Sequence, residues 1–228
     1  MPTNGRTTIA GQLNAARVAI CNTQADGELR ERVERFGYTA ARLDEGQRLY
    51  DAALAAVNAQ VAAAGAKRLA TARARAAERQ ARASYQARAG LARAVFPREP
   101  GLHKMLGLAG ETPRGTAGFL AAAGTLFANA LGTPSIRGVL ASYGYDDARF
   151  ARELAAIQAF DRAYGAQVAA IGAARLATTE QRAALGALNR WVARYLKIAR
   201  IALDDQPQLI EKLGLSAGRA ARGARQAA

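Results

Sequence analysis

A segment near residue 60 returns almost unchanged 107 residues later, and this repetition constrains the fold more than any other feature of the chain. Residues 60–71 read QVAAAGAKRLAT, and residues 167–178 read QVAAIGAARLAT. Aligned without a gap, residues 37–108 and 144–215 agree at 27 of 72 positions. The sequence therefore predicts an internal duplication, with a first repeat over residues 1–112 and a second over residues 113–215 that shares one bundle with the first.

Composition favours helices over sheets. Hydrophobic residues make up 50% of the chain and aromatic residues only 6%. Much of the hydrophobic share is alanine, which has the highest helix propensity. The β-branched residues are scattered, and no stretch alternates as a strand does. We therefore expect an all-α protein.

Each repeat has the pattern of two short helices, a Gly-Tyr break, a very long helix and a short closing helix. The breaks fall at Gly37 and Gly144, where a helix end favours a left-handed residue, and Thr39 or Asp146 then follows as an N-cap. From Phe150 to Leu203 a seam can be followed at spacings of alternately four and three residues, as in a coiled coil. The predicted fold is a pseudo-two-fold symmetric bundle of antiparallel long helices with the short helices packed at its ends.

Two interpretations of the long segments are open. Each can be one continuous helix, over residues 39–96 and 146–203. Each can instead turn near its midpoint, at Gly65–Thr71 and at Gly172–Thr178, with the threonine capping the next helix. We favour the continuous helix because residues 66–70 are good helix formers.

Small residues dominate the repeated segment. If the two long helices cross at their midpoints, Gly65 and Gly172 would allow the backbones to approach more closely than the usual distance of about 8–10 Å. We therefore expect the helices to cross at these two glycines.

Six polar residues near the same midpoints lie in phase with the seam, where a fully buried charge would be costly. They are Arg68, Thr71, Arg75, Arg175, Thr178 and Arg182. The arginines can be solvated, can pair with carboxylates such as Glu78 and Glu180, or can present their guanidinium groups to an anion. Solvation or pairing is the simpler interpretation, and an anion-binding site is the more specific hypothesis.

The net charge of +14 would attract polyanions. The same stretch of the second half is more apolar than that of the first half, which carries a run of arginines, namely Arg73, Arg75, Arg79, Arg82, Arg88 and Arg93. If the chain contacts nucleic acid, the first half is the better candidate. Solvated helix faces encoded by a GC-rich genome would show the same enrichment in arginine, so the charge alone does not identify this partner.

No combination of residues indicates catalysis. The chain has one cysteine, Cys21, and one histidine, His103, whose repeat counterpart is Ile210. This excludes an intramolecular disulfide and a multi-thiolate metal site, and it indicates no nucleophile with its base. We therefore expect no enzyme activity, no metal and no cofactor, and a cytoplasmic location fits the single cysteine.

Two further segments have distinctive compositions. The uncharged residues 115–134 are rich in alanine and glycine and include Asn129, which predicts a buried helix and no membrane span. Residues 216–228 contain three arginines and no large apolar residue, which predicts a basic, disordered tail.

The function favoured by these patterns is that of a non-enzymatic helical interaction or scaffold protein, with a protein partner or a second copy of itself. The alternative is an electrostatic nucleic-acid-binding protein that contacts phosphates without reading sequence.

Overall fold

The structure is a computed structural model that describes residues 8–215 of the chain. All regular secondary structure in this range is helical, and no strand occurs within it, as the composition predicts. The expected basic tail, residues 216–228, lies outside the described residues.

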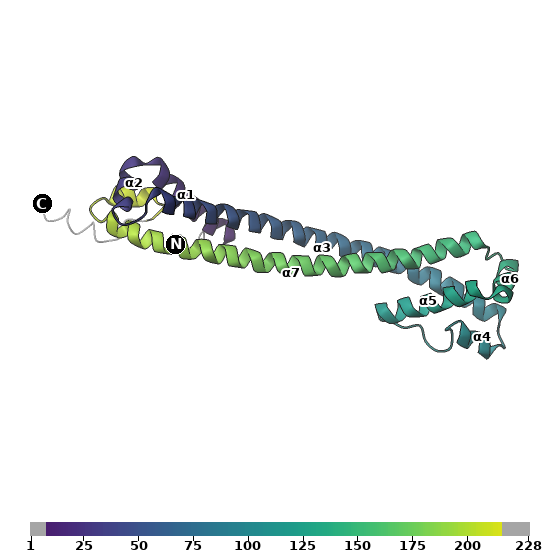
Figure 1. Ribbon diagram of the computed structural model, residues 1–228. Helices are drawn as coiled ribbons and strands as arrows, with labels where there is room; N and C mark the ends of the chain where they lie inside the picture. The colour runs from purple at the N-terminus through teal and green to yellow at the C-terminus, as the bar shows by residue number, and fades with distance from the viewer. Residues whose placement is uncertain (1–7, 216–228) are drawn as a thin grey trace. The chain divides into compact units, whose positions relative to one another are not determined.

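The two halves of the sequence contain the same kinds of helix in the same order. The first half forms α1 (Ile9–Ala25), α2 (Gly27–Glu34), α3 (Ala40–Val95) and α4 (Pro100–Met105). The second half forms α5 (Thr116–Gly132), α6 (Pro134–Ser142), α7 (Asp147–Ala202) and α8 (Pro207–Lys212). Helices α3 and α7 each run for 56 residues without a break (Figure 1). The continuous-helix interpretation is thus confirmed, and the alternative turns at residues 65–71 and 172–178 are excluded.

Local signals in the sequence end the second short helix of each half. The chain reverses at Gly37 and Gly144, whose φ angles of 84° and 80° lie in the left-handed region. Glycine is favoured there because it has no Cβ to clash with the backbone. The next amide in the first half, that of Tyr38, donates to the carbonyl of Val33 at 3.1 Å. This bond occupies a carbonyl that the helix end would otherwise leave unpaired.

Capping residues and prolines mark where several helices begin. The carboxylate of Asp146 accepts a hydrogen bond from the amide of Arg149 at 2.8 Å, so Asp146 caps the start of α7 as expected. Pro100 and Pro207 open α4 and α8. Proline suits a first turn because its missing N–H has no intrahelical partner there in any case.

The chain forms two compact units, which are described separately. Of the described residues, unit 1 contains 8–63 and 174–215. It therefore includes α1, α2, the beginning of α3, the end of α7 and α8. Unit 2 contains residues 64–173, and thus the rest of α3, then α4, α5, α6 and the beginning of α7. Each unit combines segments from both halves of the sequence.

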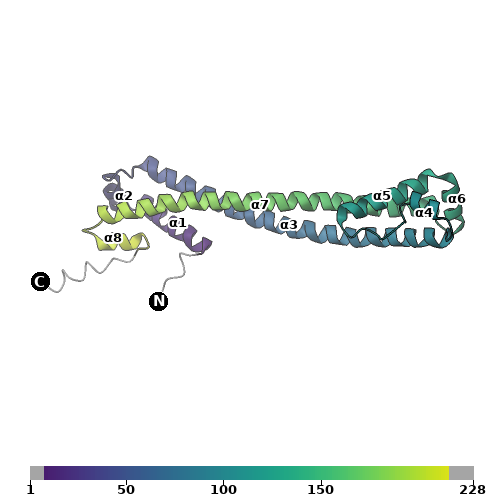
Figure 2. The ribbon, with the colours of Figure 1, turned by 90° about the horizontal axis from the view of Figure 1, so that it is seen from below.

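The core of unit 1 forms where α1, α2 and α8 pack beside the terminal parts of the two long helices (Figure 2). Leu29 and Val33 of α2 are fully buried with Tyr195 of α7 and with Leu203, which directly follows that helix. Leu209 of α8 belongs to the same cluster. Burying a large apolar side chain contributes about 1.5–3 kcal/mol, so these residues hold the short helices in place.

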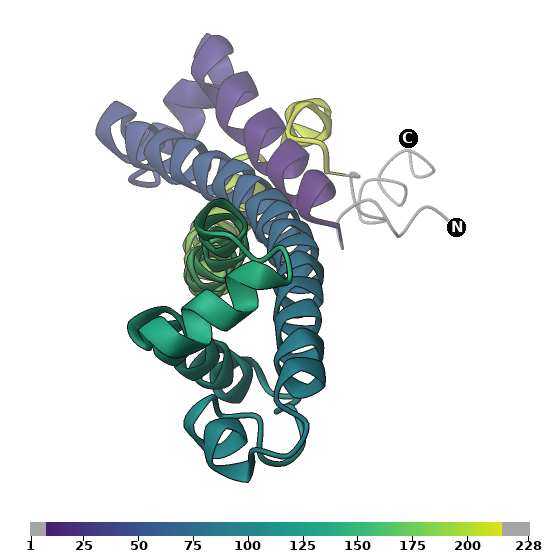
Figure 3. The same cartoon turned by 90° about the vertical axis from the view of Figure 1, so that its right-hand side faces the viewer.

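The core of unit 2 is rich in aromatic rings. Figure 3 shows α4, α5 and α6 gathered beside part of the long helices of this unit. Phe119 of α5 lies edge-on to Tyr85 of α3, with 5.6 Å between ring centres. Phe127 of α5 lies edge-on to Phe150 of α7 at 6.1 Å. Edge-to-face packing is the arrangement that aromatic rings prefer, and it fixes α5 between the two long helices.

The uncharged residues 115–134 correspond closely to α5, whose Phe119 and Phe127 are buried in unit 2. Among residues 8–215, no single helix has both the length and the apolar composition needed to cross a membrane. Helices α5 and α6 meet those criteria only as a pair, and the pair is bent by 91°.

The seam predicted along α7 is buried near its ends and exposed near its midpoint. Phe150 and Leu203 are buried, whereas Val168 is 53% exposed and Arg175 is also exposed. The predicted spacing thus continues along the whole helix, but Val168 and Arg175 are not buried near its midpoint.

Candidate functional site

The polar residues predicted to bind an anion are divided between the two units. In unit 2, Arg68, Thr71 and Arg75 follow one face of α3. The hydroxyl of Thr71 donates to the carbonyl of Lys67 at 2.8 Å and accepts from the side-chain amide of Gln167 at 3.4 Å. Both arginines are exposed. The threonine is therefore engaged within the protein, while the two guanidinium groups face solvent.

In unit 1, the equivalent residues have a similar arrangement. Thr178 donates to the carbonyl of Ala174 at 2.8 Å, and both Arg175 and Arg182 are exposed. None of the four arginines in the two sets forms an ion pair with a carboxylate among the described residues. The solvated arrangement is thus the one observed, and anion binding by these six residues stays a prediction.

The close approach expected at Gly65 and Gly172 is not found. Both glycines are exposed, and a Cβ added to either would meet no atom within 4 Å. No contact among the described residues therefore requires a missing side chain at these positions.

A close approach that does require glycine occurs at Gly46, in unit 1. A Cβ added there would lie 2.8 Å from Cζ3 of Trp191 and nearer still to two other atoms of the same indole ring. Cβ atoms essentially never come so close to another heavy atom, so the ring can occupy this place only because residue 46 has no side chain. Sequence reasoning missed Gly46, whose repeat counterpart is Glu153.

The most unusual buried group in the described chain is Arg88, whose side chain is 0% exposed in unit 2. Its Nε and Nη2 atoms donate to Oε2 of Glu153 at 3.2 and 3.1 Å. Its guanidinium carbon lies 3.5 Å from the ring centre of Phe150, 3.9 Å from that of Tyr145 and 5.6 Å from that of Phe127. The charge is thus enclosed by one carboxylate and three aromatic rings.

Physical chemistry accounts for this enclosure. Burial lowers the pKa of the Arg88 guanidinium, and the Glu153 carboxylate acts against that shift. The third nitrogen, Nη1, is buried without a hydrogen-bond partner among the described residues. The negative faces of the nearby rings attract the cation, which partly offsets the missing hydrogen bond. Arg88 is therefore a structural residue that depends on Glu153.

Uncharged residues occupy the equivalent place in unit 1. Tyr195 is the repeat counterpart of Arg88 and is fully buried, with its hydroxyl hydrogen-bonded to Thr23. Burial raises the pKa of Tyr195 to about 12, although the bond to Thr23 acts in the opposite direction. Trp191 stacks on Tyr195 with 5.4 Å between ring centres. One unit thus uses a charge pair where the other uses stacked rings over Gly46.

The arginine run of the first half presents fewer free charges than the sequence suggests. Arg88 is buried, as described above. Arg82 pairs with Glu78 at 2.9 Å, donates to the carbonyl of Arg114 at 2.8 Å and lies 4.4 Å from the ring centre of Phe119. Arg93 donates to the carbonyl of Leu108 at 3.3 Å. The fold thus engages three members of the run, and the preference for the first half as a contact for a polyanion stays a prediction.

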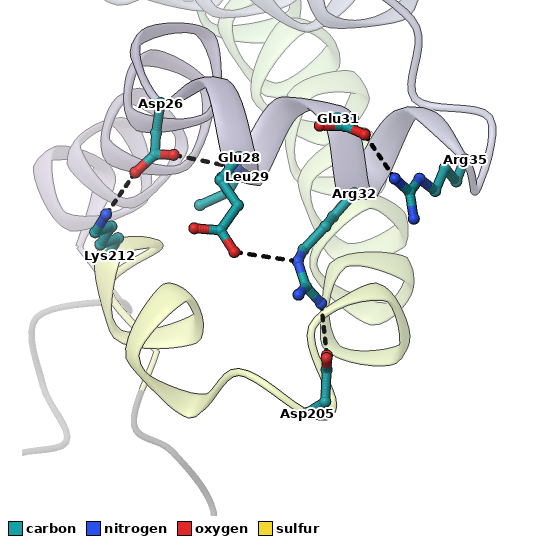
Figure 4. Close-up of polar contacts among 8 residues, drawn as sticks. All are labelled: Asp26, Glu28, Leu29, Glu31, Arg32, Arg35, Asp205 and Lys212. Carbon is teal, nitrogen blue, oxygen red and sulfur yellow. Dashed lines mark hydrogen bonds and ion pairs between the residues drawn. The ribbon is translucent and has the colours of Figure 1, made fainter.

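Charged side chains at one end of unit 1 also have structural roles (Figure 4). Asp26 accepts a hydrogen bond from the amide of Leu29 at 3.1 Å and pairs with Lys212 at 2.5 Å. Arg32 pairs with Asp205 at 2.7 Å. The bond from Lys212 lowers the pKa of Asp26, and that from Arg32 lowers the pKa of Asp205. These pairs link α2 and its N-cap with α8 and with the turn that follows α7.

One face of the segment most alike in the two halves is exposed to solvent. The relative exposure is 63% for Val61 and 62% for Leu69 on α3, and 53% for Val168 and 60% for Leu176 on α7. In each helix the valine, the glycine and the leucine are spaced by four residues, which places them along one helix face. Packing within the described chain therefore does not explain why the valine, glycine and leucine of this face recur.

The described residues offer no grouping for metal chemistry. Within residues 8–215, no three or more His, Cys, Asp or Glu side chains lie together so that they could hold a metal ion. Cys21 is exposed on α1, in unit 1, and His103 lies on α4, in unit 2. The features left for a functional inference are the exposed apolar residues and the unpaired arginines.

Similarity to known proteins does not assign a function to this chain. Comparisons with models of protein families, with curated proteins and with solved structures find no match. The structure establishes the class, an all-α protein built on two 56-residue helices. Its function is inferred from the geometry and chemistry of its own residues.

Proposed function

We propose that this chain is a non-enzymatic helical interaction protein that associates with a second copy of itself through the repeated segments of α3 and α7. The observation that carries the proposal is the exposure of the best-repeated residues. Val61, Gly65 and Leu69 recur as a second valine, glycine and leucine on α7, and all of these positions are exposed. A single exposed leucine is ordinary on a protein surface. The presence of the same exposed valine, glycine and leucine on both α3 and α7 is not explained by chance exposure of single residues.

The chemistry of this set suits the docking of a helix. Each valine or leucine that loses contact with water on association would contribute about 1.5–3 kcal/mol if fully buried. Because a Cβ at Gly65 or Gly172 would meet no atom of the described chain, space is left there for an approaching helix backbone. A surface present twice on one chain is suited to pairing with a copy that carries the same surface.

We also infer that the two halves arose by duplication and are related by a pseudo-two-fold axis. Support comes from two hydrogen bonds whose residues are 107 positions apart. The side-chain Nδ2 of Asn22 donates to the backbone carbonyl of Lys212 at 2.6 Å, and that of Asn129 donates to the backbone carbonyl of Met105 at 2.5 Å. The first helix of each half is thus bound to the closing helix of the other half, and two-fold symmetry requires this reciprocity.

Sedimentation equilibrium over a range of protein concentrations tests the self-association. We expect the wild-type chain to dimerise reversibly. Replacing Leu69→Gln together with Leu176→Gln should weaken the dimer by about tenfold or more, which corresponds to about 1.4 kcal/mol. Glutamine preserves helix propensity and charge, so the change isolates the loss of apolar surface.

The matched control replaces Ala59→Gln together with Ala166→Gln, two exposed counterparts on the same helices that lie away from the Val-Gly-Leu face. Its dimerisation should match that of the wild type. A wild-type chain that stays monomeric at every concentration, or equal weakening in the control, would reject self-association through this surface.

The unpaired arginines of unit 2 favour a second candidate function, electrostatic binding of nucleic acid. Arg68, Arg75 and Arg79 lie along one face of α3, are exposed, and have no carboxylate partner among the described residues. Guanidinium groups that approach phosphates release bound counterions, which makes such binding weaken steeply as salt rises.

Binding of a duplex DNA of arbitrary sequence, measured in rising salt, tests this candidate. The double substitution Arg75→Gln and Arg79→Gln should reduce the slope of log affinity against log salt by about 1.8, because each phosphate contact contributes about 0.9. The control pair Arg48→Gln with Arg200→Gln, in unit 1, removes the same charge and should leave the slope nearly unchanged. An affinity that does not change with salt, or an equal reduction of the slope in both pairs of variants, would contradict a site on this face.

A further inference from the structure

Unit 1 contains a pocket of about 340 Å³ between its parts of α3 and α7. Arg42 and Glu45 of α3 line one side, with Tyr38 just before that helix. Arg190 and Arg194 of α7 line the other side, together with the indole ring of Trp191. The volume lies at the lower end of the range for small-molecule sites, about 300–1,000 Å³, so the pocket suits a compact ligand.

The charges around this pocket are unbalanced. It is lined by three guanidinium groups and by one carboxylate, that of Glu45. Neither Arg42, Arg190 nor Arg194 forms an ion pair with any carboxylate among the described residues. Arg42 instead donates to the backbone carbonyl of Gly37 at 3.1 Å. The lining therefore carries a net charge of about +2, which favours a ligand with two negative charges.

Aromatic rings form a rigid part of the lining. The ring of Tyr38 stands at 82° to that of Trp191, with 5.8 Å between their centres, and Tyr195 stacks on Trp191 from within the core. The guanidinium of Arg42 lies 5.2 Å from the ring centre of Tyr38. Burial raises the pKa of Tyr38, whereas the charges of Arg42 and Arg194 act to lower it. Cations and flat rings thus meet at one place.

The equivalent region of unit 2 shows what unit 1 lacks. Arg149, the repeat counterpart of Arg42, lies 3.9 Å from the ring centre of Tyr145 and 3.4 Å from a carboxylate oxygen of Glu153. The counterpart of Glu153 in unit 1 is Gly46, which supplies no charge and is covered by Trp191. Unit 2 therefore pairs its stacked arginine with a carboxylate, whereas Arg42 of unit 1 forms no ion pair among the described residues.

We propose that the pocket of unit 1 binds a small organic dianion, namely a phosphate group attached to a flat aromatic ring. The guanidinium groups of Arg190 and Arg194 neutralise the phosphate, since guanidinium presents paired donors that match phosphate oxygens. Trp191, which is only partly buried, packs with the ring of the ligand, and the buried Tyr38 holds the indole from its edge. The site is separate from the self-association surface and does not depend on it.

Intrinsic fluorescence tests the proposal directly, because Trp191 is the only tryptophan in the chain and lines the pocket. Phenyl phosphate serves as the probe, added at constant ionic strength to the full-length chain. We expect a saturable change in emission with a dissociation constant of about 1 mM or lower, as suits a ligand of this size. Inorganic phosphate and benzyl alcohol, which each lack one half of the ligand, should bind at least about tenfold more weakly.

Variants locate the binding. The double substitution Arg190→Gln and Arg194→Gln should weaken the binding of phenyl phosphate at least about tenfold. Arg200 is an exposed arginine farther along α7, and Arg200→Gln should change the affinity less than about twofold. The replaced side chains are exposed, so the fold and the fluorescence signal are retained. No saturation at about ten times the expected constant, or equal weakening by Arg200→Gln, would overturn the site. Equal affinity for inorganic phosphate would overturn the role of the rings.

Discussion

Replacing Glu153→Ala should lower the free energy of unfolding by about 3–5 kcal/mol, because it leaves the buried guanidinium of Arg88 without its carboxylate. The aromatic rings around Arg88 attract the cation but cannot accept the two hydrogen bonds that Glu153 accepts. Chemical denaturation followed by far-ultraviolet circular dichroism measures the loss. Since the pair is buried, the loss should persist in high salt.

A double variant separates the charge from the packing. Replacing Arg88→Leu and Glu153→Leu together removes both partners and leaves an apolar interior, which is often neutral or stabilising relative to a buried ion pair. The double variant should therefore be more stable than the Glu153→Ala protein. If the separate costs of Arg88→Leu and Glu153→Leu add up to that of the double variant, or if Glu153→Ala costs less than about 1 kcal/mol, the pair contributes little.

Replacing Gly46→Ala should destabilise the protein by about 1–3 kcal/mol, because the new methyl group would overlap the indole ring of Trp191. The gain of up to about 1 kcal/mol in helix propensity on changing glycine to alanine only partly offsets this cost. Thermal or chemical unfolding measures the net loss, and a shift in tryptophan emission should accompany it, since the displaced ring is the only tryptophan.

The same substitution at Gly65, on the same helix, is the matched control. A methyl group there meets no atom within 4 Å, so Gly65→Ala should stabilise the protein by about 0.5–1 kcal/mol through propensity alone. In a Trp191→Leu background, Gly46→Ala should lose most of its cost. A stabilised Gly46→Ala protein, or a cost that survives removal of the indole, would contradict the contact as its cause.

The helices of this protein are predictable from sequence because local signals set them. Gly37 and Gly144 have the left-handed φ angles that the Gly-Tyr breaks indicate, and Asp146 caps α7 as expected. Alanine-rich segments without proline extend α3 and α7 to 56 residues each. These features depend on neighbouring residues alone, so one sequence suffices to find them.

The burial of Arg88 depends on residues distant in sequence, and for this reason the sequence pattern misassigns it. In the sequence it is one of a run of arginines, and its carboxylate partner is 65 residues away. A signal was nevertheless present. The other half has Tyr195 in place of Arg88 and Gly46 in place of Glu153, so both members of the pair change together. In this chain the paired difference coincides with the contact between Arg88 and Glu153.

The repeated midpoint segment shows the opposite error, in which the sequence suggests burial and the structure shows exposure. Its identity in both halves suggests that it packs tightly within the chain, yet Val61, Leu69 and Gly65 are exposed. Retention of a residue reports that it is constrained, but it does not report whether the constraint comes from the core or from a surface. Exposure in the structure supplies that distinction, and the proposal of self-association rests on it.

The composition of the two compact units affects the order in which the protein can fold during synthesis. Unit 2 is one continuous segment, residues 64–173, whereas unit 1 joins a segment made before it to residues made after it. Leu29 and Val33 are buried with Tyr195 and Leu203, which are synthesised only near the end of the chain. Unit 2 can therefore complete its core before the residues that cover the apolar face of α2 have been synthesised. A nascent chain in this state exposes apolar surface and is prone to misassembly with other chains.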